Sequence, residues 1–160
     1  GSALFGSDVV DAYLRHLLPR AAAVTPNRDE LALLTGRTLD DLFSVERACV
    51  ELAKRLNGPL VFASGGRMVG SEAIDVVAWK DSVNRLSGPR HATVNTAGSG
   101  DALSAAMTAG LAHGLAPDVA AEAAKAFVGR ALAGAAGWNL GAGRGPLDQL
   151  DWAGAARAKI

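Results

Sequence analysis

The sequence AAAVTPNRDELALLTG at residues 21–36 joins a short apolar run to a helical pattern through a Pro-Asn pair. Residues 21–25 lack the alternation of apolar and polar side chains, which is typical of a strand buried on both faces. Residues 30–35 then follow helical spacing up to Gly36, a residue type that often ends helices. A buried strand that leads directly into a helix favours an α/β fold, in which helices pack on a sheet.

The same alternation of helices and strands continues on both sides of this stretch. Helical spacing and cap residues predict helices over residues 7–18, 44–56, 98–113, 117–136 and 147–158. Apolar runs predict strands over residues 59–63, 73–79 and 83–86. The last two strands flank a Lys-Asp-Ser turn, as in a hairpin. We therefore expect a layered sheet with helices on its faces.

The composition describes one soluble globular domain and excludes several classes of partner. Of the 160 residues, 49% are hydrophobic and 20% charged, and no apolar run approaches the roughly 18 residues that a membrane span needs. The 16 basic and 16 acidic residues cancel, which argues against nucleic-acid partners. Cys49 is the single cysteine and is expected in the core, so a cytoplasmic location is predicted. The three histidines lack ligand spacing, which predicts no structural metal site.

The strongest candidate site is the segment NTAGSGD at residues 95–101, which opens a long predicted helix. Its Gly-Ser-Gly turn exposes backbone N–H groups at the positive end of the helix dipole, and such groups bind anions. The expected anion hole consists of Ala97, Gly98, Ser99 and Gly100. Asp101 follows in the first helical turn, where it can accept a proton from a hydroxyl that attacks the anion. The alternative is that Asp101 only stabilises the helix dipole.

A second candidate site lies directly after the strand over residues 21–25. Asn27 and Glu30 are three residues apart at a helix start, so their side chains share one face. Amide and carboxylate oxygens suit magnesium and its phosphate partners, which predicts a magnesium-supporting pair. The same spacing also fits a capping box, in which each side chain bonds the backbone N–H of the other residue.

A glycine-rich loop, GAGRGP, occupies residues 141–146. Arg144 lies in this loop, where its cation would face phosphate if the loop lined a nucleotide pocket. An ordinary surface loop fits the same composition, so the residues of this loop leave both interpretations open.

Three segments in this order make a more specific pattern than any one of them. They are TPNRDE at residues 25–30, NTAGSGDALSAAMTAGLAHG at residues 95–114 and GAGRGPLDQL at residues 141–150. Together they resemble the ribokinase-like kinases, and most closely the hydroxymethylpyrimidine/phosphomethylpyrimidine kinases of thiamine biosynthesis. The resemblance implies a three-layer αβα sandwich with a mostly parallel sheet. It also implies that residues 1–160 are the C-terminal portion of a single kinase domain whose N-terminal part is absent.

The resemblance further implies an activity and a set of site residues. The family transfers the γ-phosphoryl group of ATP to hydroxymethylpyrimidine and to its monophosphate, with Mg²⁺ as cofactor. Asp101 then falls on the catalytic position, residues 97–100 on the anion hole, and Asn27 with Glu30 on the magnesium and phosphate position. The implied nucleotide-binding residues are Thr96, Gly65, Gly66, Gly143 and Arg144.

Departures from the family pattern keep two alternatives open. The pyrimidine kinases usually carry cysteine where Asp101 stands and lysine where Ser64 stands, and a histidine of each glycine-rich loop is replaced by Ala97 and Ala142. Asp101 and the missing lysine favour a pyridoxal kinase as the enzymatic alternative. The second alternative is a non-catalytic nucleotide-binding fragment that needs a partner half. Sheet edges left exposed without the N-terminal part predict a homo-oligomer or such a partner, besides a small-molecule substrate.

Overall fold

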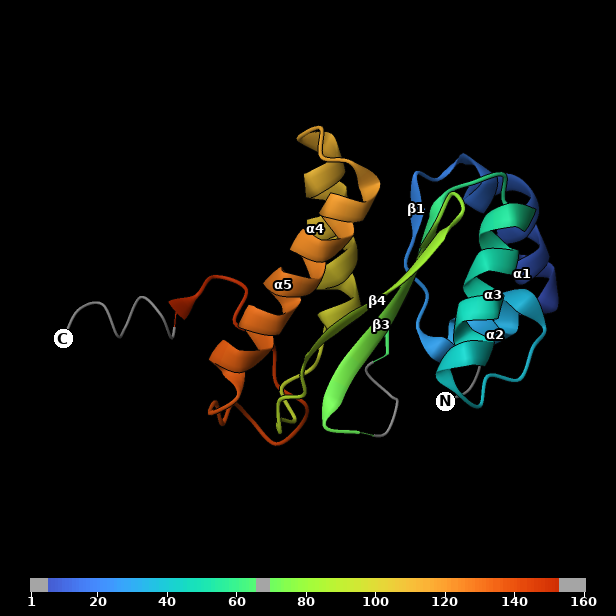
Figure 1. Ribbon diagram of the computed structural model, residues 1–160. Helices are drawn as coiled ribbons and strands as arrows, with labels where there is room; N and C mark the ends of the chain where they lie inside the picture. Colours follow the sequence, from blue (N-terminus) through green and yellow to red (C-terminus); the bar gives the residue numbers. More distant parts are fainter. Residues whose placement is uncertain (1–5, 66–69, 153–160) are drawn as a thin grey trace. The chain divides into compact units, whose positions relative to one another are not determined.

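The computed structural model describes residues 6–65 and 70–152 (Figure 1). The chain divides into two compact units, which are described separately. The first unit comprises Gly1–Met68 with Ile74–Leu86, and the second comprises Val69–Ala73 with Ser87–Ile160. None of the helices in these described ranges has the length and hydropathy that a membrane span requires.

The first unit alternates helices and strands, as the sequence predicts. Its elements are α1 (Ser7–Ala12), a π-helical turn (Tyr13–Leu17), a 3-10 turn (Leu18–Arg20), β1 (Ala23–Val24), α2 (Arg28–Thr35), α3 (Leu42–Arg55) and β2 (Leu60–Ala63). The single helix predicted over residues 7–18 is wrong in its second half, where α geometry gives way to π and 3-10 turns. Pro19 explains the change, because proline has no N–H to donate and its ring crowds the preceding turn.

The described sheet has the order β1-β2-β3-β4, in which β3 (Glu72–Trp79) and β4 (Ser82–Pro89) form the predicted hairpin. β1 pairs with β2 in parallel, whereas β2 pairs with β3 antiparallel, with Val61 opposite Ala78. The expectation of a mostly parallel sheet is therefore wrong for the described strands, which form a mixed sheet. The reason is connectivity: a helical crossover joins β1 to β2 and permits parallel pairing, whereas a tight turn reverses the chain between β3 and β4.

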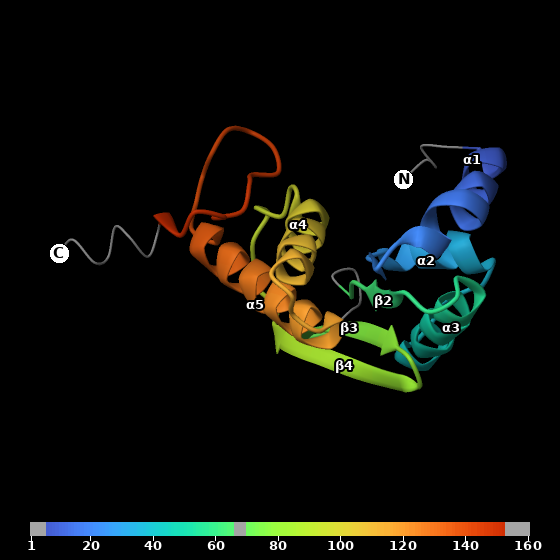
Figure 2. The same ribbon diagram turned by 90° about the horizontal axis from the view of Figure 1, so that it is seen from above.

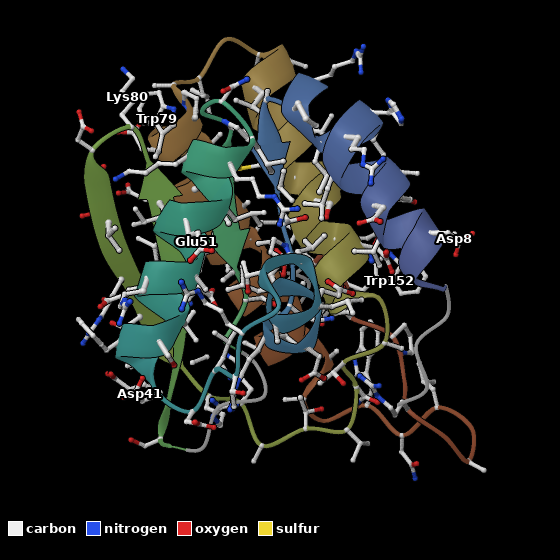
Figure 3. All side chains as sticks on the ribbon, turned by 90° about the vertical axis from the view of Figure 1, so that its right-hand side faces the viewer. Asp8, Asp41, Glu51, Trp79, Lys80 and Trp152 are labelled. Carbon is white, nitrogen blue, oxygen red and sulfur yellow. The ribbon has the colours of Figure 1, made fainter. Side chains whose placement is uncertain are left out.

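Helix α3 supplies much of the core of the first unit. Asp41 caps its start by accepting a 2.7 Å hydrogen bond from the Ser44 amide (Figure 3). Ala48, Cys49 and Leu52 follow at helical spacing and are fully buried, which confirms the core position predicted for Cys49. Burial also raises the pKa of the Cys49 thiol to about 12, because the thiolate would lose its hydration.

Two helices dominate the second unit, α4 (Ser99–Ala112) and α5 (Pro117–Ala135). They lie side by side as a helical hairpin in both ribbon views (Figures 1 and 2). Small residues permit the close approach: a Cβ atom added to Gly110 would lie 3.1 Å from the Cβ of Ala120. The start of α4 at a glycine turn and the start of α5 at Pro117 agree with the sequence prediction.

The helix predicted over residues 147–158 is wrong for its first five residues, which are not helical. Asp148 is buried there, and its backbone N–H donates to the carbonyl of Ala131 at 3.0 Å. Its carboxylate accepts the N–H of Trp152 at 2.8 Å, so the segment is held by these bonds to α5 and to the following turn. Residues 153–158 of that prediction lie outside the described residues.

Candidate functional site

The start of α4 presents backbone N–H groups that find no acceptor among residues 6–65 and 70–152. Gly98 is the N-cap residue with φ 81°, a left-handed conformation that favours glycine, and no side chain caps the helix. The amide of Ser99 donates to the carbonyl of Thr96 at 3.3 Å. Within the described residues, the amides of Gly100 and Asp101 have no acceptor in the protein. This helix start therefore has the free N–H groups and the dipole of an anion site, as predicted.

Asp101 lies in the first turn of α4 with its side chain exposed to solvent. Within the described residues its carboxylate forms no hydrogen bond or ion pair, and one of its oxygens would lie 3.9 Å from a Cβ atom added to Gly98. A carboxylate without protein partners beside free amide donors is available to accept a proton from a reacting hydroxyl.

Arg144 is fixed next to this helix start by Thr96. Its Nε and Nη2 atoms donate to Thr96 Oγ1 at 3.2 and 2.6 Å, and Nη2 also lies 3.4 Å from the Thr96 carbonyl oxygen. The amide of Ala97 donates to the carbonyl of Gly145 at 3.1 Å, and a parallel bridge links Ala97 to Pro146. The glycine-rich segments at residues 95–101 and 141–146, which are distant in sequence, therefore contact each other.

Asn95 opens the candidate segment at residues 95–101 but was assigned no role from the sequence, and it is buried, with 2% of its surface exposed. Its Nδ2 donates to the carbonyl of Ala135, the last residue of α5, at 2.7 Å, and to the carbonyl of Trp138, three residues further along the chain, at 2.9 Å. The partners are 40 and 43 positions away in sequence, so no local pattern identifies them. The one available signal was an amide side chain directly beside a predicted phosphate-binding turn.

In the first unit, Asn27 and Glu30 form the capping box that was the alternative to a magnesium pair. Asn27 Oδ1 accepts the Glu30 amide at 3.0 Å, and Glu30 Oε2 accepts the Asn27 amide at 2.8 Å. Asn27 also forms a parallel bridge with Ser64, and the Ser64 amide donates to the carbonyl of Pro26 at 3.0 Å. The candidate residues of this unit thus gather at the carboxyl ends of the parallel strands β1 and β2, an edge where α/β sheets bind ligands.

Gly65, predicted to contact nucleotide, is buried against β3. Its amide donates to Asp75 Oδ1 at 2.7 Å, and a Cβ atom added to it would lie 1.6 Å from the carbonyl oxygen of Ile74. Close packing of backbone therefore requires glycine at this position, whatever else it does. Gly66 lies outside the described residues, and exposed Gly143 lies next to Arg144 in the second unit.

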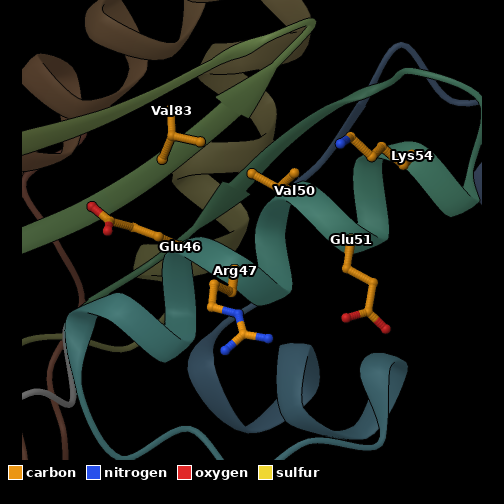
Figure 4. A pocket seen from close by; sticks show the side chains of 6 residues that line it. All are labelled: Glu46, Arg47, Val50, Glu51, Lys54 and Val83. Carbon is orange, nitrogen blue, oxygen red and sulfur yellow. The ribbon is translucent and has the colours of Figure 1, made fainter.

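The first unit also has a groove of about 590 Å³, whose lining includes none of these candidate residues (Figure 4). It is lined by Glu46, Arg47, Val50, Glu51, Lys54 and Val83. Glu46 is paired with Arg85 and Glu51 with Arg37, so its acidic groups already have partners. No group of three or more histidine, cysteine or acidic side chains within residues 6–65 and 70–152 is arranged to hold a metal ion.

Comparison with known proteins connects this geometry to a family. The family model described as phosphomethylpyrimidine kinase matches residues 1–148. The chain belongs to the phosphomethylpyrimidine kinase family. The hydroxymethylpyrimidine/phosphomethylpyrimidine kinase of Rhizobium meliloti is 40% identical over 149 residues, covering 92% of this chain and 55% of the relative. That of Streptomyces coelicolor is 38% identical over 154 residues, covering 96% and 55%. The chain therefore spans about half the length of these relatives.

Solved structures confirm the α/β fold expected of this phosphomethylpyrimidine kinase family member. The pyridoxal kinase of Staphylococcus aureus in complex with AMP-PCP aligns with a TM-score of 0.84 at 28% identity, covering 92% of this chain and 54% of that one. The phosphomethylpyrimidine kinase of Clostridium difficile aligns with a TM-score of 0.67 at 26% identity, covering 82% and 52%. The ribokinase-like resemblance and the family drawn from the three sequence segments are both confirmed.

Proposed function

We propose that the protein phosphorylates hydroxymethylpyrimidine and its monophosphate with ATP, in thiamine biosynthesis. The observation that supports this most directly is the start of α4, where free amides, the Arg144 guanidinium and the Asp101 carboxylate occur together. Donors for a phosphate next to an unpaired base are the elements that phosphoryl transfer needs. The names of the relatives supply the substrate class.

Each group at the start of α4 has a role in the proposed transfer. ATP supplies the γ-phosphoryl group, whose bond to the ADP oxygen breaks as the hydroxymethyl oxygen bonds to phosphorus. Asp101 accepts the proton that this hydroxyl loses. The amides of Gly100 and Asp101, together with Arg144, stabilise the negative charge on the transferring group. Within the described residues, Arg144 is the cation that a hydrogen bond to Thr96 holds beside the start of α4.

Asn27 and Glu30 are the residues that we assign to magnesium. The capping box uses one oxygen of each side chain, and a carboxylate oxygen has further lone pairs, so the donor set still suits a cation that prefers oxygen ligands and retains water. Bound magnesium would neutralise charge on the nucleotide phosphates. Asn27 and Glu30 lie at the carboxyl ends of β1 and β2, which supports their assignment to magnesium.

Pyridoxal is the second candidate substrate. Two observations favour it: Asp101 replaces the cysteine usual in pyrimidine kinases, and pyridoxal kinases are among the solved structures that align well, with a TM-score of 0.84 in one case. A cytoplasmic, oligomeric protein is our accompanying prediction.

The deciding experiment measures ADP release by the natural protein with Mg²⁺–ATP and either hydroxymethylpyrimidine or pyridoxal. A higher kcat/KM for the pyrimidine supports the proposal, whereas a higher value for pyridoxal replaces it by the second candidate. If calorimetry detects ATP binding but neither hydroxymethylpyrimidine nor pyridoxal causes ADP release, the protein is a non-catalytic nucleotide-binding protein.

A further inference from the structure

We infer that Asn95 is a positioning residue that fixes Arg144 and Gly145 beside the amides at the start of α4. This inference rests on the proposed function, since it concerns the same phosphate site. Asn95 does not itself reach the start of the helix. It acts through the glycine-rich loop at residues 141–146, which carries the cation of the site.

The side-chain amide of Asn95 has one orientation that satisfies its surroundings. Both hydrogens of Nδ2 are used, because the carbonyls of Ala135 and Trp138 accept them at 2.7 and 2.9 Å. The backbone amide of Asn95 donates to Thr93 Oγ1 at 3.0 Å. With 2% of its surface exposed, the residue is almost entirely withdrawn from solvent. The oxygen Oδ1 is thereby directed away from α5.

That oxygen lies against Gly145. A Cβ atom added to Gly145 would stand 2.0 Å from Asn95 Oδ1 and 2.9 Å from its Cγ, so the amide occupies the space of any side chain there. Gly145 is buried, and its carbonyl accepts the Ala97 amide at 3.1 Å. The position of Gly145 relative to the anion hole is therefore set by contacts on two sides.

The same residue connects to Arg144 along a second route. Thr96 follows Asn95 directly in the chain and holds the Arg144 guanidinium through Oγ1 at 2.6 and 3.2 Å. Arg144 also precedes Gly145 in the chain. Its backbone is therefore held near Asn95 through Gly145, and its guanidinium is held through Thr96. Displacing the Asn95 amide should move the cation relative to the free amides of α4, and should weaken ATP binding more than it slows the chemical step.

The first test replaces Asn95 by aspartate in the natural protein and measures KM for ATP, kcat and KM for the pyrimidine. Asn95→Asp has nearly the same shape but presents oxygen where two carbonyls need donors. We expect KM for ATP to rise about tenfold, with a change in KM for the pyrimidine below about twofold. The control is Met107→Ala, which removes a side chain buried in α4 without touching the loop. Equal rises of KM for ATP in both variants, at matched thermal stability, would overturn the inference.

A pair of glycine variants tests the same point if Asn95→Asp does not fold. Gly145→Ala places a methyl group on the Asn95 amide, whereas an added Cβ at Gly129 meets nothing within 4 Å. Gly145→Ala should weaken ATP binding, and Gly129→Ala should not. Wild-type affinity in Gly145→Ala would contradict the proposed positioning.

The last test asks whether Asn95 acts through Arg144. If it does, Asn95→Asp adds little to the loss of ATP affinity caused by Arg144→Ala, because the positioned group is already absent. Fully additive losses would overturn the inference. ATP affinity measured by calorimetry keeps the test independent of turnover: absence of kinase activity would refute the proposed function, while the coupling of the two residues in binding would still be measured.

Discussion

Asn27 and Glu30 each accept a hydrogen bond from the backbone of the other, at 3.0 and 2.8 Å, and this reciprocal pair starts α2. The structural role is therefore secured by geometry, and any role toward magnesium is additional to it. Substitutions that keep the cap while changing the charge can separate the two roles.

Glu30→Gln should raise the Mg²⁺ concentration required for half-maximal activity several-fold and leave the free energy of unfolding almost unchanged. Glutamine serves at the third position of a capping box as well as glutamate does, so only the charge is lost. Activity titrated with Mg²⁺, together with urea denaturation, measures both effects. Glu51→Gln removes one charge from the same unit and should leave the Mg²⁺ requirement at the wild-type value. If Glu30→Gln behaves as this control does, the magnesium assignment fails.

Asp101→Asn should lower kcat by about 10²–10⁴-fold with little change in KM for ATP, because an amide cannot accept the proton of the attacking hydroxyl. Steady-state ADP release with saturating hydroxymethylpyrimidine is the measurement. Asp118→Asn is the matched control, since Asp118 is likewise an exposed acid in the first turn of a helix, α5. Wild-type turnover in Asp101→Asn would reduce Asp101 to a residue that only stabilises the dipole.

Arg144→Ala should raise KM for ATP about tenfold and weaken the dependence of that KM on ionic strength, because one charge pair with phosphate is removed. Arg130→Ala on α5 removes an equally exposed cation from the same unit and should change neither quantity. The measurement is KM for ATP at two salt concentrations. A parallel shift in both variants would mean that net charge, not the position of Arg144, governs binding.

The raised pKa of the buried Cys49 thiol should make the free energy of unfolding depend on pH. The thiol titrates near 9.0 when free and near 12 in the folded protein, so between these values the unfolded chain releases a proton that the folded chain retains. The free energy of unfolding should therefore fall as the pH rises above 9, by about 2 kcal/mol at pH 10.5. Denaturant titrations at pH 8 and pH 10.5 measure the fall. In Cys49→Ala this part of the pH dependence should disappear, and an undiminished fall would refute the prediction.

Features encoded by neighbouring residues were predictable from the sequence. The end of α2 at Gly36, the hairpin of β3 and β4 and the start of α4 after Gly98 each depend on residues a few positions apart. The change from α to π and 3-10 hydrogen bonding along the first helix was not predicted, because the sequence pattern does not show how the missing N–H of Pro19 alters the preceding turns. The capping box and the magnesium pair at Asn27 and Glu30 share one spacing, which on its own favoured the capping box, and the resemblance to the family added the magnesium role.

The joining of two glycine-rich segments lay beyond any local pattern. The bonds from Asn95 to Ala135 and Trp138 and from Arg144 to Thr96 connect residues 40 to 48 positions apart. Sequence similarity supplied the family, but only coordinates show that the loop at residues 141–146 lies beside the start of α4. The role of each residue in that region had to be argued from these long-range contacts.

Helices α4 and α5 pack through residues that have almost no side-chain freedom to lose, such as Gly110 against Ala120. The packing of the helix that carries the candidate phosphate-binding turn therefore costs little side-chain entropy. The entropy lost on binding a nucleotide should fall on the ligand and on long side chains such as Arg144, which Thr96 already restrains. Affinity for phosphate at this site would then depend mainly on how much conformational freedom the Arg144 side chain still has before the ligand binds.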